Sequence, residues 1–179
     1  VDAPVYALAV DSAGDVYAGG MFMSAGGNPA ANVAKWDTSA SLWGSVAVYR
    51  EYDPNNNPVY ELYGTNGPVY ALAANSTGSR IYVGGSFSRI GDLATGNIAY
   101  LTATGYGGNA LGGGLNNAVK AIAAVGASEL YAAGDFATSG GSGIARWNGS
   151  GWSVPGSGSF SGAAAVAAME KRKARCQSW

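Results

Sequence analysis

The sequence predicts an all-β fold built from tandem copies of one short unit. Three segments share the same order of residue types: VYALAVDSAGDVYAGGMF at 5–22, VYALAANSTGSRIYVGGSF at 69–87 and VKAIAAVGASELYAAGDF at 119–136. In these copies a tyrosine follows the opening valine by 12, 13 and 12 residues, and a phenylalanine by 17, 18 and 17. No useful length of chain carries apolar residues at helical spacing. A repeat of this kind determines the fold.

Each copy is interpreted as four short strands. The first is VYALAV or its equivalent, followed by a turn rich in glycine and Asx residues. The second contains a glycine pair, Gly19-Gly20 or Gly84-Gly85, which indicates a bulge or a close backbone approach. The third ends at Trp36, Leu101 or Trp147, and the fourth runs through a second tryptophan in two copies. Those second tryptophans are Trp43 and Trp152.

Four-stranded units of 40 to 50 residues are typical of the blades of a β-propeller. We therefore expect about three blades and the first strand of a fourth, which leaves the ring incomplete within this chain. Small residues in the first strand suit an innermost position, where neighbouring blades crowd. The expected division is blade 1 at 1–47, a Tyr-rich hairpin insertion at 48–68, blade 2 at 69–116, blade 3 at 117–163, and a fourth start with a basic tail at 164–179. Within 163–175 helix propensity competes with the repeat, which favours a strand at 164–168.

The combination of V-x-A-hydrophobic-A, IYVGGSF at 81–87, NIAYL at 97–101 or GIARW at 143–147, and the glycine-rich LGGGLNN at 111–117 resembles the kelch-like propeller repeats of bacterial secreted and cell-surface proteins. The resemblance covers nearly all of the chain except the insertion and the last ten residues. It implies a propeller architecture and an extracellular or cell-surface location of the bacterial type. Copy three departs from the pattern with Ala133 in place of the first glycine.

Composition narrows the function classes. The net charge is −1 and the charged share is 12%, so no basic field predicts nucleic-acid binding. The chain has no histidine, which removes His-based triads and the usual general base near neutral pH. No apolar run is long enough to predict a membrane-inserted helix. The single cysteine, Cys176, leaves the redox compartment open.

One candidate metal site lies in the insertion. Asp53, Asn55 and Asn57 place oxygen-bearing side chains at alternate positions, as at the start of a calcium loop. Pro58 stands where such a loop has glycine, and Gly64 where it has glutamate. The other interpretation is an Asx-rich turn between two strands. Calcium is therefore the one cofactor that the sequence raises, and it raises no catalytic group.

A candidate binding or assembly surface is formed by four tyrosines of the insertion. They are Tyr49, Tyr52, Tyr60 and Tyr63. Their spacing predicts two strands with a tyrosine-rich face, which would pack against the propeller or another chain, or stack on carbohydrate. The basic cluster at 171–175 is read as a solvated tail or as a contact for an acidic partner. Five aspartates fall in or beside expected turns: Asp11, Asp15, Asp37, Asp92 and Asp135.

The leading hypothesis is a non-enzymatic propeller-repeat protein that acts in binding or assembly, at the cell surface or outside the cell. Its expected partners are further copies of itself or the remaining blades of a longer chain. One alternative is a carbohydrate-active or lyase-type enzyme fragment with its site at the mouth of the central channel, formed by a cluster of carboxylates or of tyrosine with arginine. Another is a structural subunit of a surface filament or layer, in which the Tyr-rich insertion makes the contact.

Overall fold

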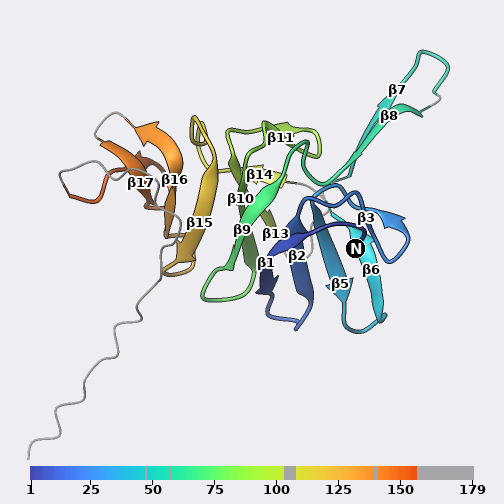
Figure 1. The fold of residues 1–179 in the computed structure, drawn as a ribbon, viewed down its shortest axis with the longest axis horizontal. Coiled ribbons are helices and arrows are strands. Elements are labelled where there is room, and N and C mark those ends of the chain that lie inside the picture. The colour runs from blue at the N-terminus through green and yellow to red at the C-terminus, as the bar shows by residue number, and fades with distance from the viewer. Residues whose placement is uncertain (47, 57, 103–107, 139–140, 157–179) are drawn as a thin grey trace, which may run out of the picture.

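The fold consists of three four-stranded antiparallel sheets that follow one another along the molecule (Figure 1). The computed structural model describes residues 1–46, 48–56, 58–102, 108–138 and 141–156, and this part of the chain contains strands and turns but no helix. Blade 1 is β1 (Val5–Val10), β2 (Val16–Gly20), β5 (Val33–Asp37) and β6 (Leu42–Ser45). Blade 2 is β9 (Val69–Ala74), β10 (Arg80–Gly85), β13 (Ile98–Thr102) and β14 (Gly108–Ala110). Blade 3 is β15 (Val119–Ala124), β16 (Leu130–Thr138), β17 (Gly141–Trp147) and β18 (Trp152–Ser153).

The blades have the strand order of a simple meander, and their first strands lie side by side. β9 packs between β1 and β15, so the first strands form the inner row of the array. This is the arrangement of propeller blades, and the three described blades do not close into a ring. The prediction of an all-β, propeller-type repeat with an incomplete ring is confirmed.

Short two-stranded hairpins accompany the blades and were not predicted from the sequence. In blade 1, β3 (Ser24–Ala25) pairs with β4 (Asn28–Pro29) between the second and third strands. In blade 2, β11 (Arg89–Ile90) pairs with β12 (Leu93–Ala94) at the same place. In blade 3 the second and third strands are longer and pair with each other as far as Thr138 and Gly141. Strands of two residues are too short for an alternating pattern to reveal them.

The hydrophobic core lies between the blades. One cluster joins Tyr17 and Val33 of blade 1 to Val69, Leu72 and Ile81 of blade 2. A second cluster joins the corresponding residues of blades 2 and 3, with Tyr82, Val119 and Ile122 among them. A blade has two faces to bury, so each depends on its neighbours for stability.

The valine and leucine of β9 face the preceding blade, whereas an alanine between them faces the following one. In β9, Val69 and Leu72 belong to the cluster shared with blade 1, whereas Ala71 belongs to the cluster shared with blade 3. The valine and the leucine are three residues apart because the ladder shifts register at this point. The same shift occurs between Val5 and Ala7 in β1 and between Val119 and Ala121 in β15. The bulge indicated by the glycine-containing strand is therefore confirmed.

The second residue of each glycine pair is required by the bulge itself. A Cβ atom at Gly20, Gly85 or Gly134 would collide with the carbonyl oxygen of the residue before the opening valine in the same blade. That carbonyl accepts a hydrogen bond from the next amide in all three copies, for example from Ser86 N to Pro68 O at 2.9 Å. This explains why all three copies keep glycine here, whereas the first position tolerates Ala133.

The insertion forms a two-stranded hairpin that projects from the row of blades (Figure 1). β7 (Val48–Tyr52) pairs with β8 (Pro58–Tyr63), with Arg50 opposite Glu61 and Glu51 opposite Tyr60. The predicted fourth start at 164–179, the basic cluster and Cys176 lie outside the described residues. Because the described residues include no helix, they include none that could cross a membrane.

We expect Gly85→Ala to destabilise the fold by roughly 3 kcal/mol, because the new methyl group must displace the Pro68 carbonyl from its hydrogen bond. Gly113→Ala is the matched control, since a Cβ there meets no atom within 4 Å. It should leave stability unchanged or raise it by about 0.5 kcal/mol. Urea unfolding followed by circular dichroism measures both, and equal stabilities of the two variants would contradict the role given to Gly85.

Candidate functional site

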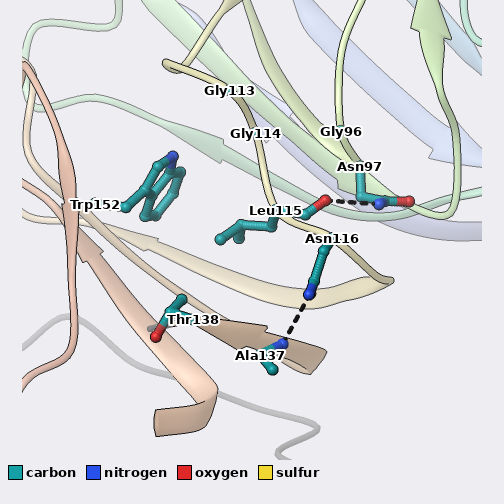
Figure 2. A pocket seen from close by; sticks show the side chains of 9 residues that line it. All are labelled: Gly96, Asn97, Gly113, Gly114, Leu115, Asn116, Ala137, Thr138 and Trp152. Atoms are coloured by element: carbon teal, nitrogen blue, oxygen red, sulfur yellow. Dashed lines mark hydrogen bonds between the residues drawn. The ribbon is translucent and has the colours of Figure 1, made fainter. Parts of the chain in front are cut away.

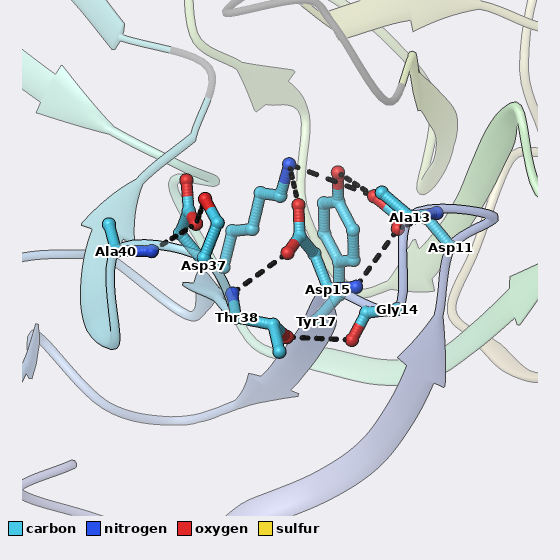
Figure 3. A network of polar contacts seen from close by, with 10 residues as sticks. Asp11, Ala13, Gly14, Asp15, Tyr17, Asp37, Thr38 and Ala40 are labelled. Atoms are coloured by element: carbon cyan, nitrogen blue, oxygen red, sulfur yellow. Dashed lines mark hydrogen bonds and ion pairs between the residues drawn. The ribbon is translucent and has the colours of Figure 1, made fainter.

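The most polar cluster of the structure lies where the β1–β2 turn of blade 1 meets β5 (Figure 3). The Oδ1 atom of Asp11 accepts hydrogen bonds from the amides of Ala13 and Asp15, at 2.9 and 3.0 Å, and so holds the turn. Its Oδ2 atom accepts from the hydroxyl of Tyr17 at 3.3 Å and lies 3.7 Å from Lys35 Nζ. The turn DSAGD therefore buries the carboxylate of Asp11 against blade 1 and does not leave it in solvent.

Lys35 reaches this carboxylate from the third strand and joins it to a second one. Its Nζ atom lies 2.7 Å from Asp15 Oδ2, and the ammonium also lies over the ring of Tyr17 at 5.5 Å from the centroid. Asp15 Oδ1 in turn accepts a hydrogen bond from the amide of Thr38 at 2.8 Å. Two carboxylates, one ammonium and one phenol thus link the first turn to the end of β5.

The ionisation of these groups follows from their contacts. The hydrogen bond from Lys35, and then the one from the Thr38 amide, hold the pKa of Asp15 below its ordinary value. Burial raises the pKa of Tyr17 to about 12, although the Lys35 charge offsets part of that effect. Burial alone would lower the pKa of Lys35, but its hydrogen bond to Asp15 and the surrounding charges outweigh burial and raise it. The cluster is a stable ion pair near neutral pH.

The contacts of these carboxylates are those of structural groups. A general acid or a glycosidase pair needs a carboxyl group available to substrate. Asp11 is 6% exposed and Asp15 8%, and both are occupied by backbone amides and Lys35. Asp37 caps a turn through the Ala40 amide at 2.8 Å. The turn interpretation of these three aspartates is confirmed, whereas Asp135 pairs with Lys120 at 2.8 Å.

Asx residues of the linkers form a second structural set, which the sequence reading missed. Three residues before each opening valine stands Asp2, Asn66 or Asn116. Its Oδ1 atom accepts backbone amides of its own blade, just after the second strand for Asp2 and Asn66 and near the end of β16 for Asn116. Examples are Met23 N to Asp2 at 3.0 Å and Arg89 N to Asn66 at 2.9 Å. Their fixed offset from the valine is the sequence signal that could have identified them.

Blades 2 and 3 leave an open depression of about 500 Å³ between them (Figure 2). Asn97 reaches across its floor, with its Nδ2 atom 2.8 Å from the carbonyl oxygen of Leu115. Asn116 accepts from the Ala137 amide, and the indole of Trp152 donates to Leu111 O at 2.9 Å. The bonds of Asn97 and Trp152 cross from one blade to the other, whereas that of Asn116 stays within blade 3, so the depression is a seam whose cited polar groups are engaged in structural contacts.

The predicted calcium ligands are only partly within the described structure. Asp53 Oδ1 accepts a hydrogen bond from the Asn55 amide at 2.9 Å, and Asp53 O accepts one from Asn56 N at 2.9 Å. These are the bonds of an Asx turn at a hairpin tip. Asn57 lies outside the described residues. Across the part of the chain that is described, no three His, Cys, Asp or Glu residues are grouped so that they could hold a metal ion.

The tyrosines of the insertion lie on the paired strands β7 and β8, but their side chains lie outside the described structure. Tyr49 is opposite Leu62, and Tyr63 is opposite Val48. Tyr52 and Tyr60 follow the same ladder, opposite Pro58 and Glu51. The strands expected of this segment are present, and its tyrosine-rich face stays a prediction.

A row of exposed aliphatic side chains lies on the first strand of blade 1. We call it the β1 face, and it consists of Val5, Leu8 and Val10, which are 39%, 64% and 52% exposed. Its counterparts in blade 2, Val69 and Leu72, are 0% and 9% exposed because blade 1 covers them. Sequence reasoning missed this face, since the three first strands look alike until their neighbours are known.

We expect Tyr17→Phe to cost about 1 kcal/mol, because Asp11 loses a hydrogen bond inside the blade. Tyr82 is its counterpart in blade 2, and its buried hydroxyl makes no hydrogen bond among the described residues. Burial raises the pKa of Tyr82, and the guanidinium of the neighbouring Arg80 lies over Tyr100, 4.8 Å from the ring centroid. Tyr82→Phe should therefore be neutral or stabilising. Chemical unfolding of both variants checks this, and the opposite ranking would contradict the network.

Acid should weaken the blade through Asp15. Its pKa is lower in the folded chain than the ordinary 3.8, so its contribution is complete above about pH 4 and is lost as the pH falls through the folded pKa. Asp15→Asn should reduce stability at pH 7 and flatten the decline of the urea midpoint between about pH 5 and pH 2. The decline should persist in part, since Asp2, Asp37 and Glu129 also have lowered pKa values. An unchanged slope would contradict the Lys35 pairing.

No family model matches the chain, and no curated protein matches it. Two solved structures have a similar course of strands: the structure of U3-55K and the crystal structure of the RRP9 WD40 repeats. Each has a TM-score of 0.49 and 14% sequence identity over 83% of this chain. The chain spans about a third of their length, 36% and 35% respectively. These values describe a resemblance in fold between this chain and two WD40-type structures.

Proposed function

We propose that this chain is a propeller-repeat protein that works by binding or assembling with another macromolecule through the β1 face. The observation that carries the proposal is the exposure of three large aliphatic side chains on a strand whose counterparts are covered. Scattered apolar residues are ordinary on protein surfaces, but a row of them at interface positions marks an interaction site. Covering Val5, Leu8 and Val10 would contribute roughly 3 kcal/mol, about half the value for burying three fully exposed side chains.

The placement of the polar groups supports binding over catalysis. Lys35 is paired with Asp15 at 2.7 Å and with Asp11 at 3.7 Å inside blade 1, and Glu129 pairs with Arg146 at 2.6 Å within blade 3. The Asx residues of the linkers cap backbone amides. The polar side chains of these clusters thus hold strands and turns in place, and the surface left for another molecule is apolar.

The kelch-like assignment and a location at the cell surface or outside the cell are further parts of this proposal. They are supported by the motif resemblance at 81–87, 97–101 and 143–147. The Tyr-rich hairpin is proposed as a second contact surface, because it projects away from the blades and would reach a neighbour without disturbing them (Figure 1).

Site-specific photo-cross-linking in the producing cells tests the binding surface. A chain with p-benzoylphenylalanine replacing Leu8 should give a discrete adduct with one macromolecule. A chain with the same residue replacing Leu42, an equally apolar position that is 51% exposed on β6, should not.

Absence of any cross-link at residue 8 above the level at residue 42, either to another macromolecule or to a further blade within a longer chain, would overturn the proposed function. The identity of the adduct also tests location, since an exclusively intracellular partner contradicts a place at the cell surface.

A further inference from the structure

We infer that the β1 face receives a further blade of this same repeat, one with glycine at the position of Gly19 and Gly84 and asparagine at the position of Asn32 and Asn97. The inference rests on the proposed function and names the partner. It is drawn from the two interfaces inside the chain, which repeat the same contacts and specify what a third must supply.

The apolar half of each internal interface is a valine that occupies the space of a missing Cβ. A Cβ at Gly19 would lie 2.5 Å from Val69 Cγ1 and 3.2 Å from Leu72 Cγ. A Cβ at Gly84 would lie 2.7 Å from Val119 Cγ1 and 2.8 Å from Ile122 Cδ1. All of these atoms belong to the following blade, so glycine is needed here for docking and not for the folding of its own blade.

Blade 1 presents the same valine and leucine to the side where a preceding blade would stand. Val5 aligns with Val69 and Val119, since each lies opposite the second glycine of its blade at the register shift. Leu8 aligns with Leu72 and Ile122 in the same ladders. The covered valines are 0% exposed, whereas Val5 is 39% exposed. The β1 face is thus the same docking surface without its partner.

The polar half of each interface is an asparagine with a left-handed backbone. Asn32, with φ of 63°, donates from Nδ2 to Thr65 O at 3.0 Å, and Asn97, with φ of 59°, donates to Leu115 O at 2.8 Å. Backbone amides return the contact, with Thr65 N bonded to Ala31 O at 3.0 Å and Leu115 N bonded to Gly96 O at 2.7 Å.

Thr65 and Leu115 each stand four residues before the opening valine of their blade, and in blade 1 this place is taken by Val1. Thr65 is 0% exposed and Leu115 is 4% exposed, whereas Val1 is 53% exposed. Val1 therefore stands at the position whose backbone oxygen accepts the asparagine hydrogen bond in the other two blades, and this position is exposed.

A second copy of this chain does not offer the required face. Its blades 1 and 2 already use Gly19 and Gly84 against the blades that follow them. Its blade 3 has Ala133 where glycine is needed, paired with Ala121 as Gly84 is paired with Ala71. Blade 3 also has Gly143, with φ of 83°, in place of the asparagine. Gly143 keeps the left-handed backbone of the asparagine position but lacks the side-chain amide that would donate to the next blade.

A tandem chain supplies the inferred partner. Residues 65–114, which carry blade 2 with Gly84 and Asn97, are placed directly before Val1, so that Val1 takes the place of Leu115. Val5→Cys in a Cys176→Ser background reports on coverage of the β1 face through its reaction rate with a thiol reagent. We expect the added blade to slow this reaction by at least about tenfold, because a buried thiol reacts only when the interface opens.

Control chains distinguish specific packing of the added blade on the β1 face from the effect of its covalent attachment alone. The same tandem with Gly84→Ala in the added blade should leave the thiol as reactive as in the unfused chain, because the three atoms nearest to that Cβ all belong to the following blade. A Leu42→Cys reporter on β6 should react equally in all chains. Leu8→Cys serves as a second reporter where Val5→Cys fails to fold, as judged by circular dichroism.

The inference is overturned if the added blades with glycine and with alanine at position 84 slow the thiol reaction equally, or if neither of them slows it. A fall in Val5→Cys reactivity of the unfused chain with rising concentration also overturns it, since the occupant would then be a second copy. The cross-linking experiment is independent: an adduct at residue 8 with a partner lacking the glycine and asparagine pattern keeps the proposed function and rejects the blade.

Discussion

The apolar packing between successive blades brings a valine into the space that a glycine leaves open in the preceding blade. Val69 approaches Gly19 and Val119 approaches Gly84 so closely that no Cβ fits between them. The first strands can then lie side by side at the inner row, where a blade has least room. The aliphatic side chains next to each valine complete a core that neither blade forms alone. The two glycines of a pair have different roles. The second permits the bulge that orients the valine of its own blade. The first leaves space for the valine of the next blade.

Polar residues fix the ends of the blades that this packing brings together. At one end, the turn after each first strand donates to the next blade, from Ser12 N to Gly78 O and from Ser76 N to Gly126 O, both at 3.1 Å. At the other end, Asn32 and Asn97 hold the following linker. Since both sets are backbone-directed, the residue types between them can drift. Asp11 of blade 1 and Asn75 of blade 2 occupy the same turn position, yet one binds Tyr17 and Lys35 while the other reaches Ala127 O.

The repeat alone was enough to predict the strands that matter for the fold. The first, second and third strands were found because large and small apolar residues recur at fixed offsets from Val5, Val69 and Val119, and the bulge was found from the glycine pair. The hairpins β3–β4 and β11–β12 escaped because a two-residue strand has no period. The division of labour between Gly19 and Gly20 also escaped, because a neighbouring blade supplies the atoms that distinguish them.

The candidate site could not be predicted for a related reason. Val5 and Val69 are the same residue type in the same local sequence, and only the presence of a covering blade makes one buried and the other exposed. Residue types that carry chemistry are rare in this sequence, and they predicted sites at Asp53, at the tyrosines of the insertion and at the turn aspartates. The described contacts of Asp53 include those of a turn, and those of Asp15 include an ion pair. In a repeat protein the informative comparison is between copies: a position that is buried in two blades and open in the third shows where the molecule still has an interface to fill. Blade 3 differs from blades 1 and 2 at the two positions that contact a following blade, because it has Ala133 in place of the glycine and Gly143 in place of the asparagine.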